Sequence, residues 1–123
     1  MKGKSNYEAV TNAWNADTDN YGNHKHFNVK TTYDAGGAKT TGSGDLDELK
    51  TNIDVAIKAS LYYWQLRNLN TYASTGDIAD NDDNDIDRVG KVINSGSATG
   101  TAPNGFVERR TFTKNAFTIL NQL

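Results

Sequence analysis

The longest apolar-periodic stretch of the chain, from Leu46 to about Tyr72, constrains the fold most. Within it Ile53, Ile57 and Leu61 recur at every fourth residue, and Trp64 follows three residues later. Residues three and four apart share one face of an α-helix. The spacing therefore predicts a central helix, or two helices in series, whose apolar face is the most buried surface of the protein.

Two capping boxes predict where helices begin. Ser5 and Glu8 have the spacing at which each side chain satisfies an amide of a helix start, and a first helix is expected from Ser5 to about Asn15. Its apolar residues fall on one face: Tyr7, Val10 and Trp14. Asp45 and Glu48 form the second box, at the start of the central stretch.

Two more helices are expected in the C-terminal part. The first carries Ile86, Val89 and Ile93 on one face and ends at Asn94-Ser95-Gly96, because glycine commonly terminates helices. The last carries an apolar stripe and its flanks: Phe112, Ala116, Ile119 and Leu123, widened by Phe117 and Leu120. With the first helix and the central one, this makes about four helices.

The stretch from Asp17 to Gly44 is rich in Asn, Asp, Gly, Thr and Lys and is mostly loop. Alternating apolar and polar residues begin at Phe27, and Asp34-Ala35-Gly36-Gly37 could turn the chain back. A small β-hairpin is therefore expected at residues 27–41. The fold class predicted is mainly α, arranged as a single domain over residues 1–123.

Composition excludes several classes of protein. Charged residues make up 23% of the chain and the net charge is −2, so a basic nucleic-acid surface is not indicated. No cysteine is present, so neither disulfides nor a thiolate zinc site can form. No apolar run is long enough to span a membrane, and no signal peptide is visible, which predicts a cytoplasmic location unless export occurs by other means.

Neither a metal nor a cofactor is expected. The run from Asp80 to Asp85 is rich in oxygen ligands, but an EF-hand loop that began at Asp80 would need glycine in place of Asp85 and glutamate in place of Lys91. A solvated acidic loop before a helix is the favoured interpretation. His24-Lys25-His26 lacks the cysteines or the HExxH spacing of a zinc site.

The sequence contains no G-x-S-x-G turn for a nucleophilic serine. Paired carboxylates could hydrolyse glycosides, but Glu8, Glu48 and Glu108 are the only glutamates, and each is expected in a helix first turn. Such glutamates usually act as caps or solvated charges, so no catalytic residue is assigned.

Four segments in order have a helical pattern found together in one enzyme family. They are Lys4-Ser5-Asn6-Tyr7-Glu8-Ala9, Lys58-Ala59-Ser60-Leu61-Tyr62-Tyr63-Trp64, Val89-Gly90-Lys91-Val92-Ile93-Asn94-Ser95-Gly96 and Glu108-Arg109-Arg110-Thr111-Phe112-Thr113-Lys114. With them, residues 1–15 and 45–123 resemble the C-terminal part of the glycoside hydrolases that include plant class I and II chitinases and related phage and bacterial lysozymes. The stretch 17–41 has no counterpart in that pattern.

The resemblance implies a lysozyme-like helical domain that acts on or binds β-1,4-linked N-acetylhexosamine polymers, either peptidoglycan or chitin. It carries sugar-binding roles to Asn6, Lys58 and Asn94, and it matches Arg109 to the arginine that pairs with the acid glutamate. Both catalytic glutamates of the family precede the matching segments, so a truncated form without acid and base is expected. The resemblance thus leaves enzymatic activity undecided.

Each assigned residue also has a structural interpretation. Asn6 could simply occupy a first helical turn, Asn94 could end its helix, Lys58 could be solvated, and Arg109 could pair with a nearby carboxylate. A second function also stays open, a non-enzymatic helical interaction protein such as an inhibitor or a phage structural component. The partners expected are glycan oligomers, with neither nucleic acid nor membrane, and a homodimer or a complementing N-terminal half.

Overall fold

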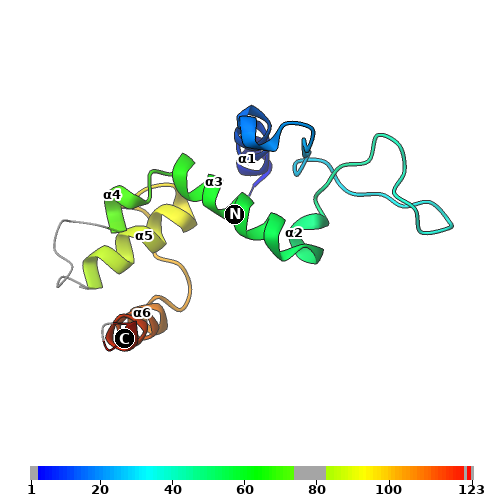
Figure 1. Ribbon diagram of the computed structural model, residues 1–123. Helices are drawn as coiled ribbons and strands as arrows, with labels where there is room; N and C mark the ends of the chain where they lie inside the picture. Colours follow the sequence, from blue (N-terminus) through cyan, green and yellow to red (C-terminus); the bar gives the residue numbers. More distant parts are fainter. Residues whose placement is uncertain (1–2, 74–82, 121, 123) are drawn as a thin grey trace. The chain divides into compact units, whose positions relative to one another are not determined.

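The computed structural model describes residues 3–73, 83–120 and 122. These residues are mainly helical and contain no β-strand, which confirms the mainly α prediction (Figure 1). The chain divides into two compact units, Met1–Leu66 and Arg67–Leu123. That they form a single lysozyme-like domain stays a prediction. Over the described residues, no helix combines the length and the apolar character needed to cross a membrane.

Unit 1 is built on the packing of α1 (Lys4–Ala16) against α3 (Ile53–Leu66), with a 3-10 turn at Thr18–Asn20 and the short α2 (Glu48–Thr51). Its core comprises Val10, Trp14, Phe27, Val55, Ala59 and Tyr63. The rings of Trp14 and Phe27 meet edge to face with centroids 5.3 Å apart, the geometry that aromatic pairs prefer. The predicted apolar face of the first helix is therefore confirmed.

The predicted cap at Ser5 is wrong. The helix begins at Lys4, its N-cap is Gly3, and no side chain caps it. Gly3 has a φ of 82°, a left-handed value that glycine adopts without a steric penalty, so the chain enters the helix there. Ser5 consequently lies inside the first turn.

The second predicted capping box, at Asp45 and Glu48, is also wrong. The Asp45 side chain bonds to residues of the loop and does not cap a helix. The N-cap of α2 is Asp47, again without a side-chain bond. The buried Asp45 carboxylate accepts a hydrogen bond from the backbone amide of His26 (2.7 Å) and pairs with Lys39. Burial of a carboxylate is tolerable when it is paired in this way.

The long segment between α1 and α2 belongs to unit 1 and contains little regular structure (Figure 1). Side-chain hydrogen bonds hold it to α1. The Asn15 amide donates to the carbonyl of Lys25 and accepts from its backbone N–H, both at 2.8 Å. The predicted hairpin is reduced to one antiparallel bridge between Tyr33 and Lys39. Strands do not form in this described segment, and the polar side chains replace the missing ladder.

The predicted central helix is broken at two places, at Asn52 and at residues 67–69. The predicted buried face of α3 is wrong: Ile53, Ile57 and Leu61 are 71%, 55% and 63% exposed. The buried residues are instead Val55, Ala59 and Tyr63. Small Ala59 suits close approach to α1, and this contact decided the orientation of α3 more strongly than the stripe of large aliphatic residues.

Unit 2 contains α4 (Asn70–Ala73), α5 (Asp83–Ser95) and α6 (Phe106–Leu120). Its most buried apolar side chains are Leu69 and Val92. The predicted end of the third helix is confirmed, because Gly96 follows the last helical residue with a φ of 80° and its amide donates to the carbonyl of Val92 at 2.8 Å.

The predicted stripe of the last helix is mostly solvent-exposed. Phe112, Ile119 and Leu120 are exposed, and Phe117 is half-buried. Leu123 lies outside the described residues. The stripe stays outside because α6 docks on α5 through a different set of side chains, which includes two ion pairs.

Candidate functional site

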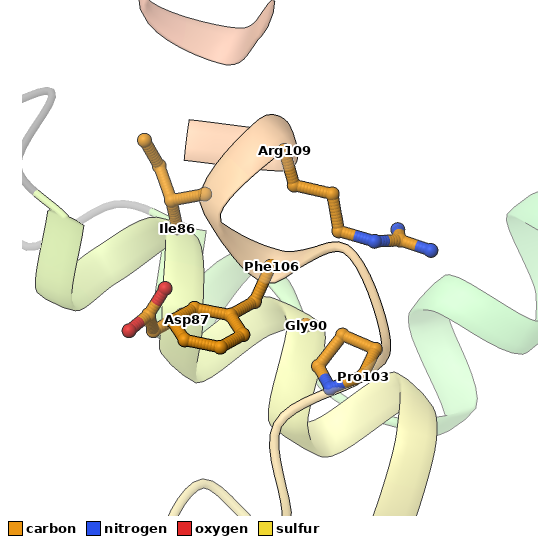
Figure 2. A pocket seen from close by; sticks show the side chains of 6 residues that line it. All are labelled: Ile86, Asp87, Gly90, Pro103, Phe106 and Arg109. Carbon is orange, nitrogen blue, oxygen red and sulfur yellow. The ribbon is translucent and has the colours of Figure 1, made fainter. Parts of the chain in front are cut away.

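A shallow depression lies between α5 and α6 in unit 2 (Figure 2). Its lining comprises Ile86, Asp87, Gly90, Pro103, Phe106 and Arg109. It encloses about 160 Å³ of empty space, counting the part open to solvent. The enclosed part of the depression has room for about one water molecule, so a larger ligand can lie only across its mouth.

Two ion pairs set the register of the helices that build the depression. Asp83 pairs with Lys114 at 2.6 Å, and Asp87 pairs with Arg110. The two acids are one turn apart on α5, and the two bases are one turn apart on α6 in the reverse order. This matched spacing fixes which residues of α6 face α5.

Gly90 and Pro103 lie in close contact and form the floor of the depression. A Cβ placed on Gly90 would lie 3.3 Å from Cγ of Pro103, closer than most side chains tolerate. Glycine at this point of α5 therefore lets the loop before α6 cross the helix directly. The ring of Phe106, 38% exposed, provides an apolar edge beside it.

The two adjacent arginines of α6 differ in their surroundings. Arg110 donates two hydrogen bonds to the Asp87 carboxylate, one of them at 2.8 Å, and its guanidinium lies 5.0 Å from the centroid of the Phe106 ring. These bonds hold the pKa of Asp87 below its usual value. The Arg109 side chain extends away from that carboxylate (Figure 2). Within the described ranges, the Arg109 guanidinium makes no hydrogen bond or ion pair.

Asn94 lies one helical turn after Gly90, on the same face of α5. Its Nδ2 donates to the carbonyl of Thr101 at 3.1 Å. The Asn94 amide thus ties the end of α5 to the loop that leads to Pro103. Its Oδ1 has no partner in the described part of the chain and can accept a hydrogen bond from a ligand.

The other two predicted sugar-binding residues lie in unit 1. Asn6 is half-buried in the first turns of α1. Lys58 lies on α3, where its ammonium bonds Oδ1 of Asn20 and stands 5.1 Å from the centroid of the Trp14 ring. Asn94 and Arg109 are therefore brought into one unit, and Asn6 and Lys58 into the other.

Lys58 belongs to a polar network that closes one end of the unit 1 core. Nδ2 of Asn20 donates to the carbonyl of Trp14 (2.8 Å) and to the hydroxyl of Tyr62 (2.9 Å), and that hydroxyl donates to Asp17. The hydrogen bond from Tyr62 lowers the pKa of Asp17, while burial and the neighbouring carboxylate raise the pKa of Tyr62. With its ammonium in this network, Lys58 has a structural role.

The carboxylates do not form a recognisable catalytic or metal-binding set in the described residues. Glu48 pairs with Lys25 at 2.7 Å, Glu8 is exposed on α1 just after its first turn, and Glu108 is exposed in the first turn of α6. Groups of three or more metal-ligating side chains are likewise absent from these ranges. The first half of the acidic run, residues 80–82, lies outside them. No metal centre can therefore be assigned within the described residues.

Asp87, Arg110, Pro103 and Phe106 were not singled out from the sequence. A signal for the ion pairs was present: Asp83 and Asp87 are four residues apart, as are Arg110 and Lys114, which is the spacing of one helical turn. The contact of Pro103 with Gly90 left no such signal, because it depends on how the loop crosses α5.

No protein-family model, curated protein or solved structure matches the chain.

Proposed function

We propose that the chain is a chitinase- or lysozyme-type domain that binds β-1,4-linked N-acetylhexosamine polymers without hydrolysing them. The observation that carries the proposal is the open depression of unit 2, with Arg109 and Phe106 at its edge and Asn94 one turn along α5. An amide offers both a donor and an acceptor to acetamido and hydroxyl groups, and an apolar ring edge suits the C–H face of a sugar.

The positions of the four resembling segments also support the proposal. Asn6-Tyr7 falls in the first turn of α1, and Lys58 to Trp64 lies within α3. Asn94-Ser95-Gly96 ends α5, and Glu108 to Lys114 lies within α6. Each segment therefore has the helix position that the resemblance requires of it.

The absence of hydrolysis is proposed from the state of the carboxylates. Protonation of a glycosidic oxygen needs an acid whose pKa is raised, commonly by an apolar pocket. Asp87 is the carboxylate in the lining of the depression, and the Arg110 guanidinium lowers its pKa. A group in that state is a poor general acid at neutral pH.

Co-sedimentation of the full chain with insoluble chitin and with peptidoglycan, followed by an assay for new reducing ends, tests both parts of the proposal. We expect retention on at least one polymer and no new reducing ends. Retention on neither polymer would refute glycan binding, and clear release of reducing sugar would refute the absence of hydrolysis.

A matched pair of variants locates the binding to unit 2. Asn94→Ala removes the amide beside the depression and should weaken retention about three- to ten-fold, the usual range for one lost hydrogen bond. Asn12→Ala alters an exposed amide of α1 and should leave retention unchanged. Thermal unfolding of both variants separates a binding loss from a folding loss. Equal retention of Asn94→Ala and wild type would show that the sugar lies elsewhere.

The exposed aliphatic face of α3 favours a second candidate, a helical interaction protein without glycan binding. Ile53, Ile57 and Leu61 form a ridge of the kind that other helices pack against. This candidate predicts no retention on either polymer and formation of a specific assembly that Ile57→Lys abolishes. Retention on a polymer that survives Ile57→Lys would count against it.

A further inference from the structure

The charges around the unit 2 depression do not cancel. Asp87 contributes one negative charge, which Arg110 neutralises through two hydrogen bonds. Lys91 is a further cation close enough to act on Asp87. The Arg109 guanidinium, without a partner in the described ranges, adds another positive charge at the rim. The rim is therefore net positive, although the chain as a whole has a net charge of −2.

The acid next to Arg109 in the sequence, Glu108, forms no ion pair with it within the described ranges. Glu108 turns back toward the start of its helix, where its Oε2 lies 3.6 Å from the position of a Cβ on Gly105. The Arg109 side chain leaves the helix in a different direction from Asp87 (Figure 2). A planar guanidinium in this situation favours a planar anion, because it can donate two parallel hydrogen bonds to a carboxylate.

The apolar part of the depression limits which anion fits. Ile86, Pro103 and Phe106 line it beside Arg109. A small, highly hydrated inorganic ion gains nothing from such walls, whereas an organic carboxylate attached to an alkyl group can place its carbon atoms against them. The depression is too shallow to enclose a sugar ring, so the ligand lies across its mouth, with the carboxylate at the Arg109 rim.

We propose that the Arg109 depression binds a carboxylate carried by a substituent of the glycan, so that the preferred polymer is peptidoglycan, with its acidic lactyl-peptide branches, rather than neutral chitin. The inference rests on the proposed glycan binding and adds the class of polymer. Arg109 then acts as a specificity-determining residue that contacts the ligand.

Three soluble probes and the full chain test the inference. The first is an N-acetylglucosaminyl-N-acetylmuramyl dipeptide with its free carboxylate, the second is the same compound with the carboxylate amidated, and the third is a chitin tetramer. Dissociation constants are measured by titration of backbone amide shifts. We expect the free carboxylate to bind about five-fold more tightly than its amide, the gain typical of an exposed ion pair, and the gain to shrink in high salt.

Two charge-matched variants assign the gain to one residue. Arg109→Gln should abolish the difference between the acidic probe and its amide while the amidated probe binds as before. Lys50→Gln removes one positive charge from an exposed position in unit 1 and should leave the five-fold difference intact. Both variants change exposed side chains, and their unfolding curves verify that the fold is kept.

The outcomes distinguish failure of this inference from failure of the proposed function. Equal affinity of wild type for the acidic and amidated probes, or a preference that persists in Arg109→Gln, overturns the inference and leaves glycan binding in place. A loss of both probes in Arg109→Gln also overturns it, because the arginine would then bind the sugar itself. Absence of binding to all three probes by wild type overturns both proposals.

Discussion

Asn20 organises a small core through one polar side chain. It is 2% exposed, it joins the end of α1 to α3 through the Trp14 carbonyl and the Tyr62 hydroxyl, and it receives the ammonium of Lys58. Every polar atom of its amide is therefore used. A fully satisfied buried amide of this kind favours one arrangement of its neighbours over others.

Replacement of Asn20 by alanine should lower the free energy of unfolding by about 2 to 3 kcal/mol, because it removes the hydrogen bonds of the buried Asn20 amide to the Trp14 carbonyl, the Tyr62 hydroxyl and the Lys58 ammonium. Chemical denaturation measures the change. Asn12→Ala, at an exposed position of α1, is the control and should change stability by less than about 0.5 kcal/mol. Similar losses for the two variants would contradict the role given to Asn20.

Asp17 gives this network a pH dependence with a definite sign. The hydrogen bond from Tyr62 and the amide of Asp19 lower the pKa of Asp17 below 3.8 in the folded chain. A carboxylate with a lowered folded pKa adds stability above its unfolded pKa and loses it as the pH falls through the folded value. The stability gap between wild type and Asp17→Asn should therefore be present at pH 7 and shrink below 3.8. A gap that stays constant down to pH 2, measured by denaturation at each pH, would refute this.

The orientation of α3 is the main fact at the scale of one element. Its large aliphatic residues face solvent, and its core face is made of Val55, Ala59 and Tyr63. Trp14 and Phe27 already fill the space beside α1, so small or amphipathic side chains of α3 complete the packing. Periodicity identifies a helix, but the shape of the partner decides which face is buried.

A pair of alanine substitutions on α3 distinguishes the two faces. Val55→Ala should destabilise the chain by about 1 to 3 kcal/mol, because it opens a cavity in the core. Ile57→Ala removes more carbon atoms yet should cost less than about 1 kcal/mol, because the side chain is 55% exposed. If chemical denaturation showed a larger loss of stability for Ile57→Ala than for Val55→Ala, the buried face of α3 would be the one expected from the sequence.

The sequence was sufficient to predict that most of the helices exist, but it was insufficient to predict what surrounds each of them. The spacing of Tyr7, Val10 and Trp14 predicted the docking face of α1, and Gly96 predicted the end of α5, because both depend on local geometry. The aliphatic stripe of α3 was assigned to the core in error, since burial depends on partners distant in sequence. At the candidate site, Arg109 and Asn94 were identified, but the pairing of Asp87 with Arg110 that leaves Arg109 unpaired required the three-dimensional structure.

At the scale of the whole molecule, exposed apolar side chains are the dominant feature. Ile53, Ile57 and Leu61 in unit 1 and Phe112, Ile119 and Leu120 in unit 2 are all more than half exposed. Isolated exposed apolar residues are ordinary, but ridges of them on one helix face commonly mark association surfaces.

We expect these faces to drive association with a second copy of the chain. In sedimentation velocity experiments the average sedimentation coefficient should rise with protein concentration, and Ile57→Lys combined with Phe112→Lys should reduce the rise. Thr113→Lys places the same charge on an exposed polar position of α6 and should leave it unchanged. A monomer at every concentration tested would contradict this expectation.

Glycan binding at the unit 2 depression is the central claim, and titration of the full chain with the N-acetylglucosaminyl-N-acetylmuramyl dipeptide, followed through backbone amide shifts, tests it most directly. The account predicts saturable shifts at millimolar sugar that concentrate at Gly90, Asn94 and Arg109 and their neighbours. Absence of any shift at these amides, or shifts confined to unit 1, would contradict it.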